Sequence, residues 1–304
     1  MIPTVANRSG SASELREPSR PHDDRRFEPI VSPSLSRPPR ALLLLEGRAL
    51  LEMAACLPAA LLLRRAPAGD GHPVLVLPGF LASDLSTRVL RGFLRGRGYR
   101  THGWRLGRNL GPRPEVALGM AERLADLHAR YGRRVSLIGW SLGGVYAREL
   151  ARRAPETVRQ VITLGSPFRD LAATNVPTAV REAAERRVLP EHAGERALLR
   201  EPIPVPATAI YSRTDAIAAW ESCREVEGPL AENIEVESSH LGLGHHPVVL
   251  LTIADRLAQS EGEWKPFAPS PGWRWPLAPK VASRVEGHGG RELPAPVTPA
   301  DAQG

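Results

Sequence analysis

The sequence predicts an α/β fold: a mainly parallel, doubly wound sheet of about six strands with helices on both faces. Three observations predict it. Short apolar runs alternate with stretches of helical spacing between residues 67 and 262, as in sheets whose strands are connected by helices. Runs such as 74–77 have no polar alternation, which suits strands buried on both faces. Polar residues also gather just after the strands, where open α/β sheets bind their ligands.

The expected elements follow one another in a regular order. Helices are expected at 84–98, 114–132, 143–155 and 246–259, and strands at 72–80, 100–106, 134–140, 158–167, 205–213 and 233–239. Pro114 suits the first turn of its helix, where a missing N–H costs nothing. Gly132 suits the C-terminus of that helix. Asp84 is the expected N-cap of the helix that follows it.

The regions outside this pattern differ in composition. We expect a disordered basic tail at 1–40, because it is rich in proline, serine and charged residues. Residues 263–304 are rich in proline and glycine, and we expect a strap that packs through Trp264, Phe267, Trp273 and Trp275, followed by a free tail. The organisation is therefore the tail, an apolar helix at 41–66, a main domain at 67–262 with a cap-like excursion at 168–200, and the strap.

The segment 41–63 is the most apolar of the chain, but Glu46, Arg48 and Glu52 interrupt it. The charge-free run 53–63 is much shorter than the roughly 20 residues of a spanning helix. We expect a helix packed on the domain, with a helix at a membrane surface as the alternative. The N-terminus has no apolar signal region, so a cytoplasmic protein, with peripheral membrane attachment as the alternative, is the default expectation.

The charge of the chain favours no nucleic-acid partner. The net charge is +7, and its basic residues are almost all arginine, with Lys265 and Lys280 as the lysines. No basic run contains interleaved aromatic residues, so we expect no nucleic-acid binding. Two cysteines, Cys56 and Cys223, form neither a disulfide framework nor a metal motif. Composition does not indicate an oligomeric state.

The stretch LIGWSLGGVY contains a G-x-S-x-G pattern between an expected strand and an expected helix. Ser141 would sit on a sharp, strained turn that exposes its hydroxyl. Gly139 and Gly143 are expected because side chains there would collide with neighbouring backbone. The N-terminus of the helix that follows favours negative charge at the site. The pattern therefore predicts a nucleophilic serine.

Together with HPVLVLPGF, YSRTDAIAAW and SSHLGLGHHP, this pattern resembles the α/β-hydrolase superfamily, and most of all its lipase and esterase branches. The resemblance covers residues 70–260. It implies an oxyanion hole formed by two backbone N–H groups. One belongs to Leu142, after the nucleophile, and the other to Phe80, in the loop LPGFLAS, where Pro-Gly replaces the commoner His-Gly.

The resemblance also implies the chain order serine, acid, histidine. Asp215 follows the strand VPATAIYSR and is the expected acid, with Asp170 as the runner-up and Glu221 as a weaker third. His240 comes directly after the last strand and is the expected general base. His245 is the alternative base, although it and His246 precede Pro247 and are better interpreted as the start of the closing helix.

These residues predict a serine hydrolase that cleaves carboxylic esters through a Ser141–Asp215–His240 triad and an acyl-enzyme intermediate. A small-molecule or lipid ester is the expected substrate. No metal or organic cofactor is expected, because the histidine spacing fits no common zinc pattern. Thioester cleavage and acyl transfer use the same triad and stay open. So does a non-catalytic protein that binds ligands or a membrane surface through 41–63. Asn109 follows another strand and is a further candidate for the site wall.

Overall fold

The computed structural model describes residues 35–178, 199–268 and 279–281. Within these ranges seven strands form one sheet in the order β2-β1-β3-β4-β5-β6-β7. The first six pair in parallel. Their bounds are Pro73–Leu77 (β1), Arg100–Gly103 (β2), Val135–Trp140 (β3), Val158–Leu164 (β4), Ala207–Tyr211 (β5) and Ala231–Glu235 (β6). The predicted α/β fold with about six parallel strands is confirmed.

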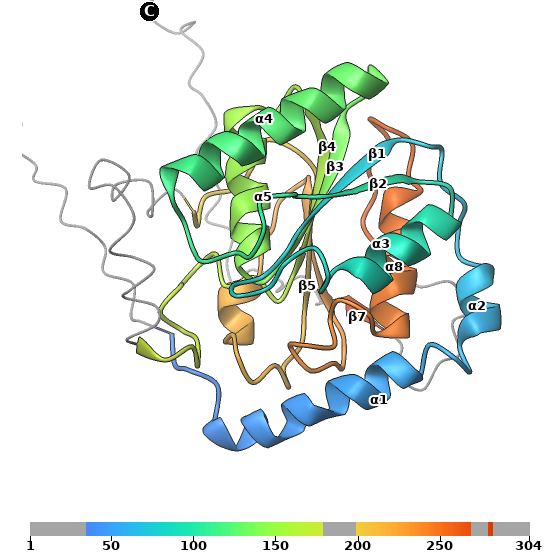
Figure 1. Ribbon diagram of the computed structural model, residues 1–304. Helices are drawn as coiled ribbons and strands as arrows, with labels where there is room; N and C mark the ends of the chain where they lie inside the picture. Colours follow the sequence, from blue (N-terminus) through green and yellow to red (C-terminus); the bar gives the residue numbers. More distant parts are fainter. Residues whose placement is uncertain (1–34, 179–198, 269–278, 282–304) are drawn as a thin grey trace, which may run out of the picture. The chain divides into compact units, whose positions relative to one another are not determined.

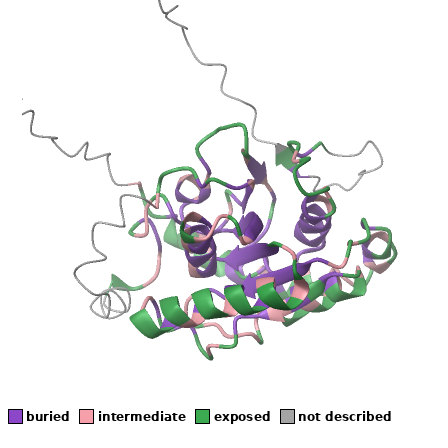
Figure 2. Ribbon diagram, turned by 90° about the horizontal axis from the view of Figure 1, so that it is seen from above, coloured by how far each residue is buried: buried purple, intermediate pink, exposed green. Residues whose placement is uncertain are grey.

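Helices cover both faces of the sheet, as Figure 1 shows. Helices α4 (Pro114–Tyr131) and α5 (Leu142–Arg153) pack on one face, and α3 (Arg88–Gly96) and α8 (Pro247–Leu257) on the other. Residues of one strand alternate between the two cores, with Leu75 in one and Val74 and Val76 in the other. The strands are therefore buried on both sides (Figure 2), which explains their unbroken apolar sequence.

Helix α4 shows how the sequence pattern produces this packing. Its buried residues are Val116, Met120, Leu124 and Leu127, which lie on one side of the helix. The helix begins at Pro114 and ends at Gly132, whose φ of 58° is the left-handed conformation that favours glycine. Each fully buried aliphatic side chain contributes about 1.5–3 kcal/mol, so this apolar stripe is what holds α4 on the sheet.

The order of the strands places the functional region. From β1 the chain moves to β2 at one edge, and then returns to β3 on the other side of β1. Adjacent loops therefore leave β1 and β3 in opposite directions, and such a crevice beyond the carboxyl ends of the strands is where α/β sheets bind ligands. The loops that begin at Pro78 and Ser141 follow these two strands.

Asp84 is not the N-cap of α3, which begins at Arg88 after Thr87. Instead, the Asp84 carboxylate accepts hydrogen bonds from the backbone N–H groups of Trp104 and Arg105, at 3.0 and 3.1 Å. It thus connects the loop after β1 to the loop after β2, a contact between distant segments that local sequence does not reveal.

The expected helix at 41–66 is divided into three short helices, and charged side chains, not the apolar ones, face the domain in its first part. It consists of η1 (Arg40–Arg48), α1 (Ala49–Ala54) and α2 (Ala60–Arg64). Glu46 is buried and Glu52 half-buried against the domain, while many of its leucines face solvent, with Leu44 87% and Leu57 80% exposed. The part at 40–54 therefore packs through charged side chains and not through an apolar face. None of the helices in the described ranges is both long and apolar enough to cross a membrane.

The C-terminal region is described only in part. Phe267 is buried against the core that contains α8. Strand β7 (Lys280–Val281) then pairs antiparallel with β6, an addition that the sequence did not predict. Trp273, Trp275 and the tail beyond 281 lie outside the described residues, as do most of the tail expected at 1–40 and residues 179–198 of the expected cap.

Candidate active site

Ser141 lies on a sharp turn between β3 and α5. Its φ of 54° and ψ of −122° are unusual for a residue with a side chain, and such a conformation costs about 1–3 kcal/mol. The turn is held by a 2.8 Å hydrogen bond from the Ser141 N–H to the carbonyl of Leu164 at the end of β4. The backbone strain therefore places the serine hydroxyl beyond the sheet, half-exposed.

The two predicted glycines are needed for steric reasons. A Cβ on Gly139 would lie 2.2 Å from Cα of Gly144, and a Cβ on Gly143 would lie 2.2 Å from the carbonyl oxygen of Leu77. Both distances are far below van der Waals contact, and both neighbours are backbone. The strand, the turn and the helix can therefore approach this closely only when both positions are glycine.

The N–H groups of Phe80 and Leu142 are available as donors. Within the described residues neither N–H has a protein acceptor, and both residues line the same cavity as Ser141. Leu142 is the first residue of α5, where helical N–H groups point out of the helix. The geometry provides two backbone donors beside one hydroxyl.

Asn109 does not line this cavity but supports one wall of it. Its side-chain amide donates to the carbonyl of Pro78 at 2.9 Å, and its backbone carbonyl accepts from the Leu81 N–H at 2.7 Å. Asn109 is fully buried. Asn109 therefore holds the loop that carries Phe80 through buried hydrogen bonds. The sequence position suggested instead that Asn109 would line the wall of the site.

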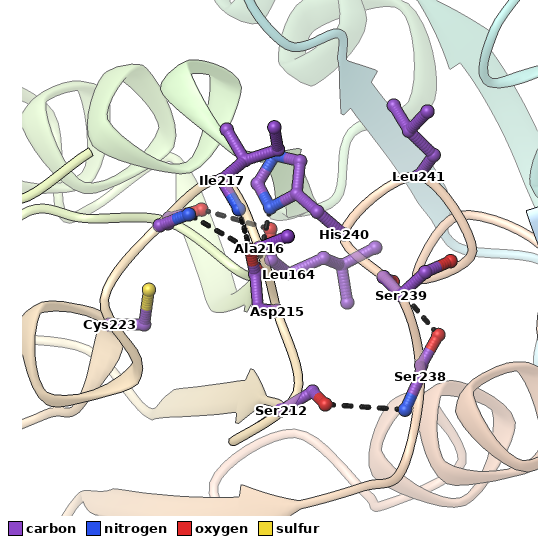
Figure 3. A network of polar contacts seen from close by, with 12 residues as sticks. Leu164, Ser212, Asp215, Ala216, Ile217, Cys223, Ser238, Ser239, His240 and Leu241 are labelled. Atoms are coloured by element: carbon purple, nitrogen blue, oxygen red, sulfur yellow. Dashed lines mark hydrogen bonds and ion pairs between the residues drawn. The ribbon is translucent and has the colours of Figure 1, made fainter. Parts of the chain in front are cut away.

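Asp215 and His240 meet although they come from different loops. His240 Nδ1 and Asp215 Oδ2 lie 2.6 Å apart (Figure 3). The other carboxylate oxygen accepts the N–H groups of Ile217 and Ala218, each at 2.8 Å. Asp215 is 3% and His240 5% exposed. These bonds fix the orientation of the carboxylate and leave Nε2 as the imidazole nitrogen without a hydrogen bond to the described residues.

The surroundings of His240 raise the pKa of its imidazole above the ordinary 6.5. Burial alone would lower it, but the charge and hydrogen bond of Asp215 and the charge of Glu46 act in the opposite direction and prevail. The site therefore stabilises the imidazolium, the form that a general base reaches when it accepts a proton.

Gly165 is part of the site that sequence reasoning missed. It follows β4 with a φ of 52°. A Cβ there would lie 2.9 Å from Asp215 Oδ2 and 3.2 Å from His240 Nδ1. Glycine therefore leaves the space in which the carboxylate and the imidazole meet. The signal in the sequence is the Gly-Ser-Pro after this strand. It predicts a turn but does not predict that Gly165 lies against Asp215 and His240.

Ser141 and His240 lie in adjacent loops but are not hydrogen-bonded. Among the described residues no hydrogen bond joins the Ser141 hydroxyl to the imidazole, although the Trp140 indole donates to the carbonyl of His240 at 3.1 Å. Leu164 holds the N–H of Ser141, and the next residue, Gly165, contacts His240. Hydroxyl-to-base distances are often long before a substrate binds.

The alternative acids and bases occupy other positions. The Asp170 carboxylate accepts the N–H groups of Leu35 and Ala172, and Glu221 lies in η3 (Trp220–Cys223) without a bond to His240. His245 Nε2 is bonded to the carbonyl of Ala49 at 2.8 Å. His246 caps α8, since its Nδ1 accepts the Val248 N–H. The structure thus brings His240, and not these residues, to Asp215.

A cavity of about 530 Å³ is lined by Ser141 and by residues of α4 and α5. Its walls are mostly apolar and include Met120, Leu124 and Val145. Apolar cavities with a few polar groups at one end are typical of small-molecule sites. In the described part of the chain, no three histidine, cysteine or acidic side chains lie together in a way that could hold a metal ion.

The strand order, the strained serine between β3 and α5 and the Asp–His pair after β5 and β6 define an α/β-hydrolase fold. The sequence matches no family model and no curated protein. Solved structures with a similar fold include a lipase of Bacillus licheniformis, with 15% identity, a TM-score of 0.48 and coverage of 64% of this chain and 94% of that one.

Two further similar structures are lipase B of Aspergillus fumigatus and the carboxylesterase CesB of Bacillus subtilis. Each is 16% identical to this chain, with TM-scores of 0.45 and 0.43 and coverage of 62% and 63% of this chain. The matched part spans 53% of the Aspergillus lipase and 85% of the carboxylesterase. Identities this low indicate a similar fold and do not establish a shared activity.

Proposed function

We propose that the protein is a serine hydrolase that cleaves carboxylic esters. Ser141 attacks the ester carbonyl while His240 Nε2 takes its proton, and Asp215 holds the imidazole at Nδ1. The N–H groups of Phe80 and Leu142 stabilise the oxyanion. The alcohol leaves with the proton from His240. Water, activated by the same histidine, then releases the acid and restores the serine.

One observation carries this proposal: the strained Ser141 shares a cavity with two backbone N–H groups that have no acceptor among the described residues, beside a buried Asp–His pair. Each feature alone has structural explanations. Their combination at the carboxyl ends of the parallel strands supplies a nucleophile, a base and oxyanion donors together. The mostly apolar cavity supports an apolar acyl group as the part of the substrate that it binds.

Hydrolysis of p-nitrophenyl acetate, butyrate and octanoate by the wild type and by Ser141→Ala tests the proposal. We expect the longer acyl chains to react with higher kcat/KM, and Ser141→Ala to lose on the order of 10⁴-fold or more in kcat. Equal rates in both proteins would refute the assignment and favour a non-catalytic binding protein. Thioesters and added alcohol acceptors, assayed in the same way, separate esterase from thioesterase and acyltransferase activity.

We also propose that the outer face of the segment 40–64 contacts anionic lipid. Leu44, Leu51 and Leu57 are among its most exposed residues. Two pairs of exposed arginines flank this apolar face: Arg37 and Arg40 at one end, Arg64 and Arg65 at the other. Each basic residue near an anionic membrane contributes about 1 kcal/mol, and exposed leucines between them add apolar burial. The charge of the flanks thus matches anionic headgroups.

Co-sedimentation with vesicles tests this contact. The full chain should bind vesicles of phosphatidylcholine with phosphatidylglycerol better than vesicles of phosphatidylcholine alone. Serine at positions 44, 51 and 57 together should lower the bound fraction, whereas Leu230→Ser, at an exposed leucine outside the segment, should not. Equal partition of wild type and triple variant would exclude the lipid contact. Concentration-dependent dimerisation lost in the triple variant would instead identify a second copy as the occupant.

A further inference from the structure

The inner face of the segment 40–54 carries charged side chains that contact the loops of the candidate site. Glu46 is 7% exposed, although glutamate is almost never buried without partners. A buried carboxylate that lacks donors is strongly destabilising. The burial of Glu46 therefore requires hydrogen-bond donors around its carboxylate.

The partners of Glu46 are backbone N–H groups from two loops. Its Oε1 accepts from His240 at 3.0 Å and from Ala216 at 3.1 Å, and its Oε2 accepts from Leu241 at 3.0 Å. Ala216 follows the candidate acid, and His240 is the candidate base. A single carboxylate thus joins the loop after β5 to the loop after β6.

Two neighbours on the same face strengthen this connection. Arg48 donates to Thr214 Oγ1 at 2.5 Å, just before the candidate acid. Glu52 accepts from the N–H and the hydroxyl of Ser239, at 2.8 and 2.6 Å, just before the candidate base. Arg48 and Glu52 are also paired with each other at 3.0 Å. The helical segment therefore holds both loops on either side of Asp215 and His240.

We propose that Glu46 is a positioning residue, which sets the distance between Asp215 and His240 by holding the backbone of both loops from outside the sheet. The inference rests on the proposed function and extends the site to a segment outside residues 67–262. Hydrogen bonds to a charged acceptor are stronger than those between neutral groups. Three of them on one buried carboxylate restrict how far either loop moves relative to the other.

The charge of Glu46 also acts on the imidazole. Asp215 and Glu46 are the charged groups that raise the pKa of His240, and the Arg48–Glu52 pair lies on the neighbouring turn of the same segment. Removing the charge of Glu46 should therefore lower the pKa of His240 toward its ordinary value. A residue that only stabilised the fold would not change this pKa.

Glu46→Gln in the full chain tests the inference, because glutamine keeps the size and one acceptor oxygen but turns an NH₂ group toward one of the three donors. We expect kcat to fall about 10- to 100-fold with KM changed less than about threefold, since small displacements of catalytic groups have effects of this size. The pKa of His240, measured by NMR on the free protein, should fall as well.

Glu232→Gln is the matched control. Glu232 is also a buried glutamate, bonded to Thr208, Arg256 and the Phe267 backbone, away from the site. It should lower the melting temperature without lowering the pKa of His240. The inference is wrong if Glu46→Gln leaves that pKa and kcat unchanged, or if it matches Glu232→Gln in every readout. A wild type that hydrolyses no ester refutes the proposed function alone, because the NMR titration needs no substrate.

Discussion

The molecule contains two groups of aspartate, histidine and serine, at opposite ends of the parallel strands of the sheet. Asp215 and His240 lie near Ser141 at the carboxyl ends. Asp70, His72 and Ser136 lie at the amino ends of β1 and β3, where His72 is bonded to Asp70 on one side and to the Ser136 hydroxyl at 2.9 Å on the other. The second group is the more completely hydrogen-bonded of the two.

The difference between these groups shows that a chain of hydrogen bonds does not make a nucleophile. Ser136 is fully buried near the amino end of β3, and it does not line the cavity that Ser141 lines. Ser141 is half-exposed and strained, and it shares its cavity with two N–H groups that have no acceptor in the described part of the chain. What distinguishes the candidate site is access for a substrate and donors for an oxyanion.

The two imidazoles also differ in their electrostatics. Burial and the charge of Arg159 lower the pKa of His72 to about 4, and the Arg159 guanidinium lies 3.1 Å from its Nδ1. The carboxylates around His240 raise its pKa instead. His72 is thus kept neutral as a structural group, while His240 readily accepts a proton.

Replacing His240 or His72 by alanine should give the largest difference in kcat between the two groups. His240→Ala should lower kcat by on the order of 10³-fold or more, because the base is lost. His72→Ala should leave kcat within about threefold but destabilise the fold by about 1–3 kcal/mol, since buried partners lose their hydrogen bonds. Ester hydrolysis and thermal melting measure the two effects. A similar loss of activity in both would mean that the amino-terminal group takes part in catalysis.

Replacing the candidate acids by asparagine should lower kcat less than replacing His240 by alanine. Asp215→Asn should lower kcat by on the order of 10²- to 10⁴-fold, because asparagine no longer stabilises the imidazolium. Asp170→Asn should retain nearly full activity, since its carboxylate caps backbone N–H groups at another place. Steady-state kinetics of the two variants decide between them, and a larger loss in Asp170→Asn would reverse the assignment.

The sequence was sufficient to predict the fold, and it placed the candidates Asp215 and His240 in loops that the structure brings together. Strand and helix periodicity, together with the Gly-x-Ser-x-Gly turn, depend on local sterics, so they are visible in short stretches. The role of Glu46 was not predictable in this way. Amphipathicity leads one to expect leucines inward, but the donors that hold Glu46 inward come from loops 170–195 residues later in the chain. The same holds for Gly165, whose neighbours are set by tertiary packing.

The raised pKa of His240 predicts the pH dependence of activity. The base must be neutral in the free enzyme, so kcat/KM should fall as pH is lowered through a value above 6.5. In Glu46→Gln this acid limb should move to lower pH, whereas in His72→Gln it should stay in place. A pH–rate profile between about pH 5 and 9 tests both statements. A wild-type midpoint at or below 6.5 would contradict the electrostatic account of His240.

The smallest expected effect concerns stability alone and has opposite signs for the two histidines. The pKa of His72 is lowered, so the unfolded chain binds a proton between pH 6.5 and about 4 that the folded protein does not. The stability due to neutral His72 is therefore present above 6.5 and is lost as pH falls toward 4, by at most about 3 kcal/mol. His240, with its raised pKa, instead contributes stability that is full below 6.5 and is lost as pH rises through its folded value. Urea unfolding at several pH values should show that wild type loses more stability than His72→Gln between pH 6.5 and 4. Parallel curves would mean that His72 titrates normally, and the contrast between the two groups would then rest on access and oxyanion donors alone.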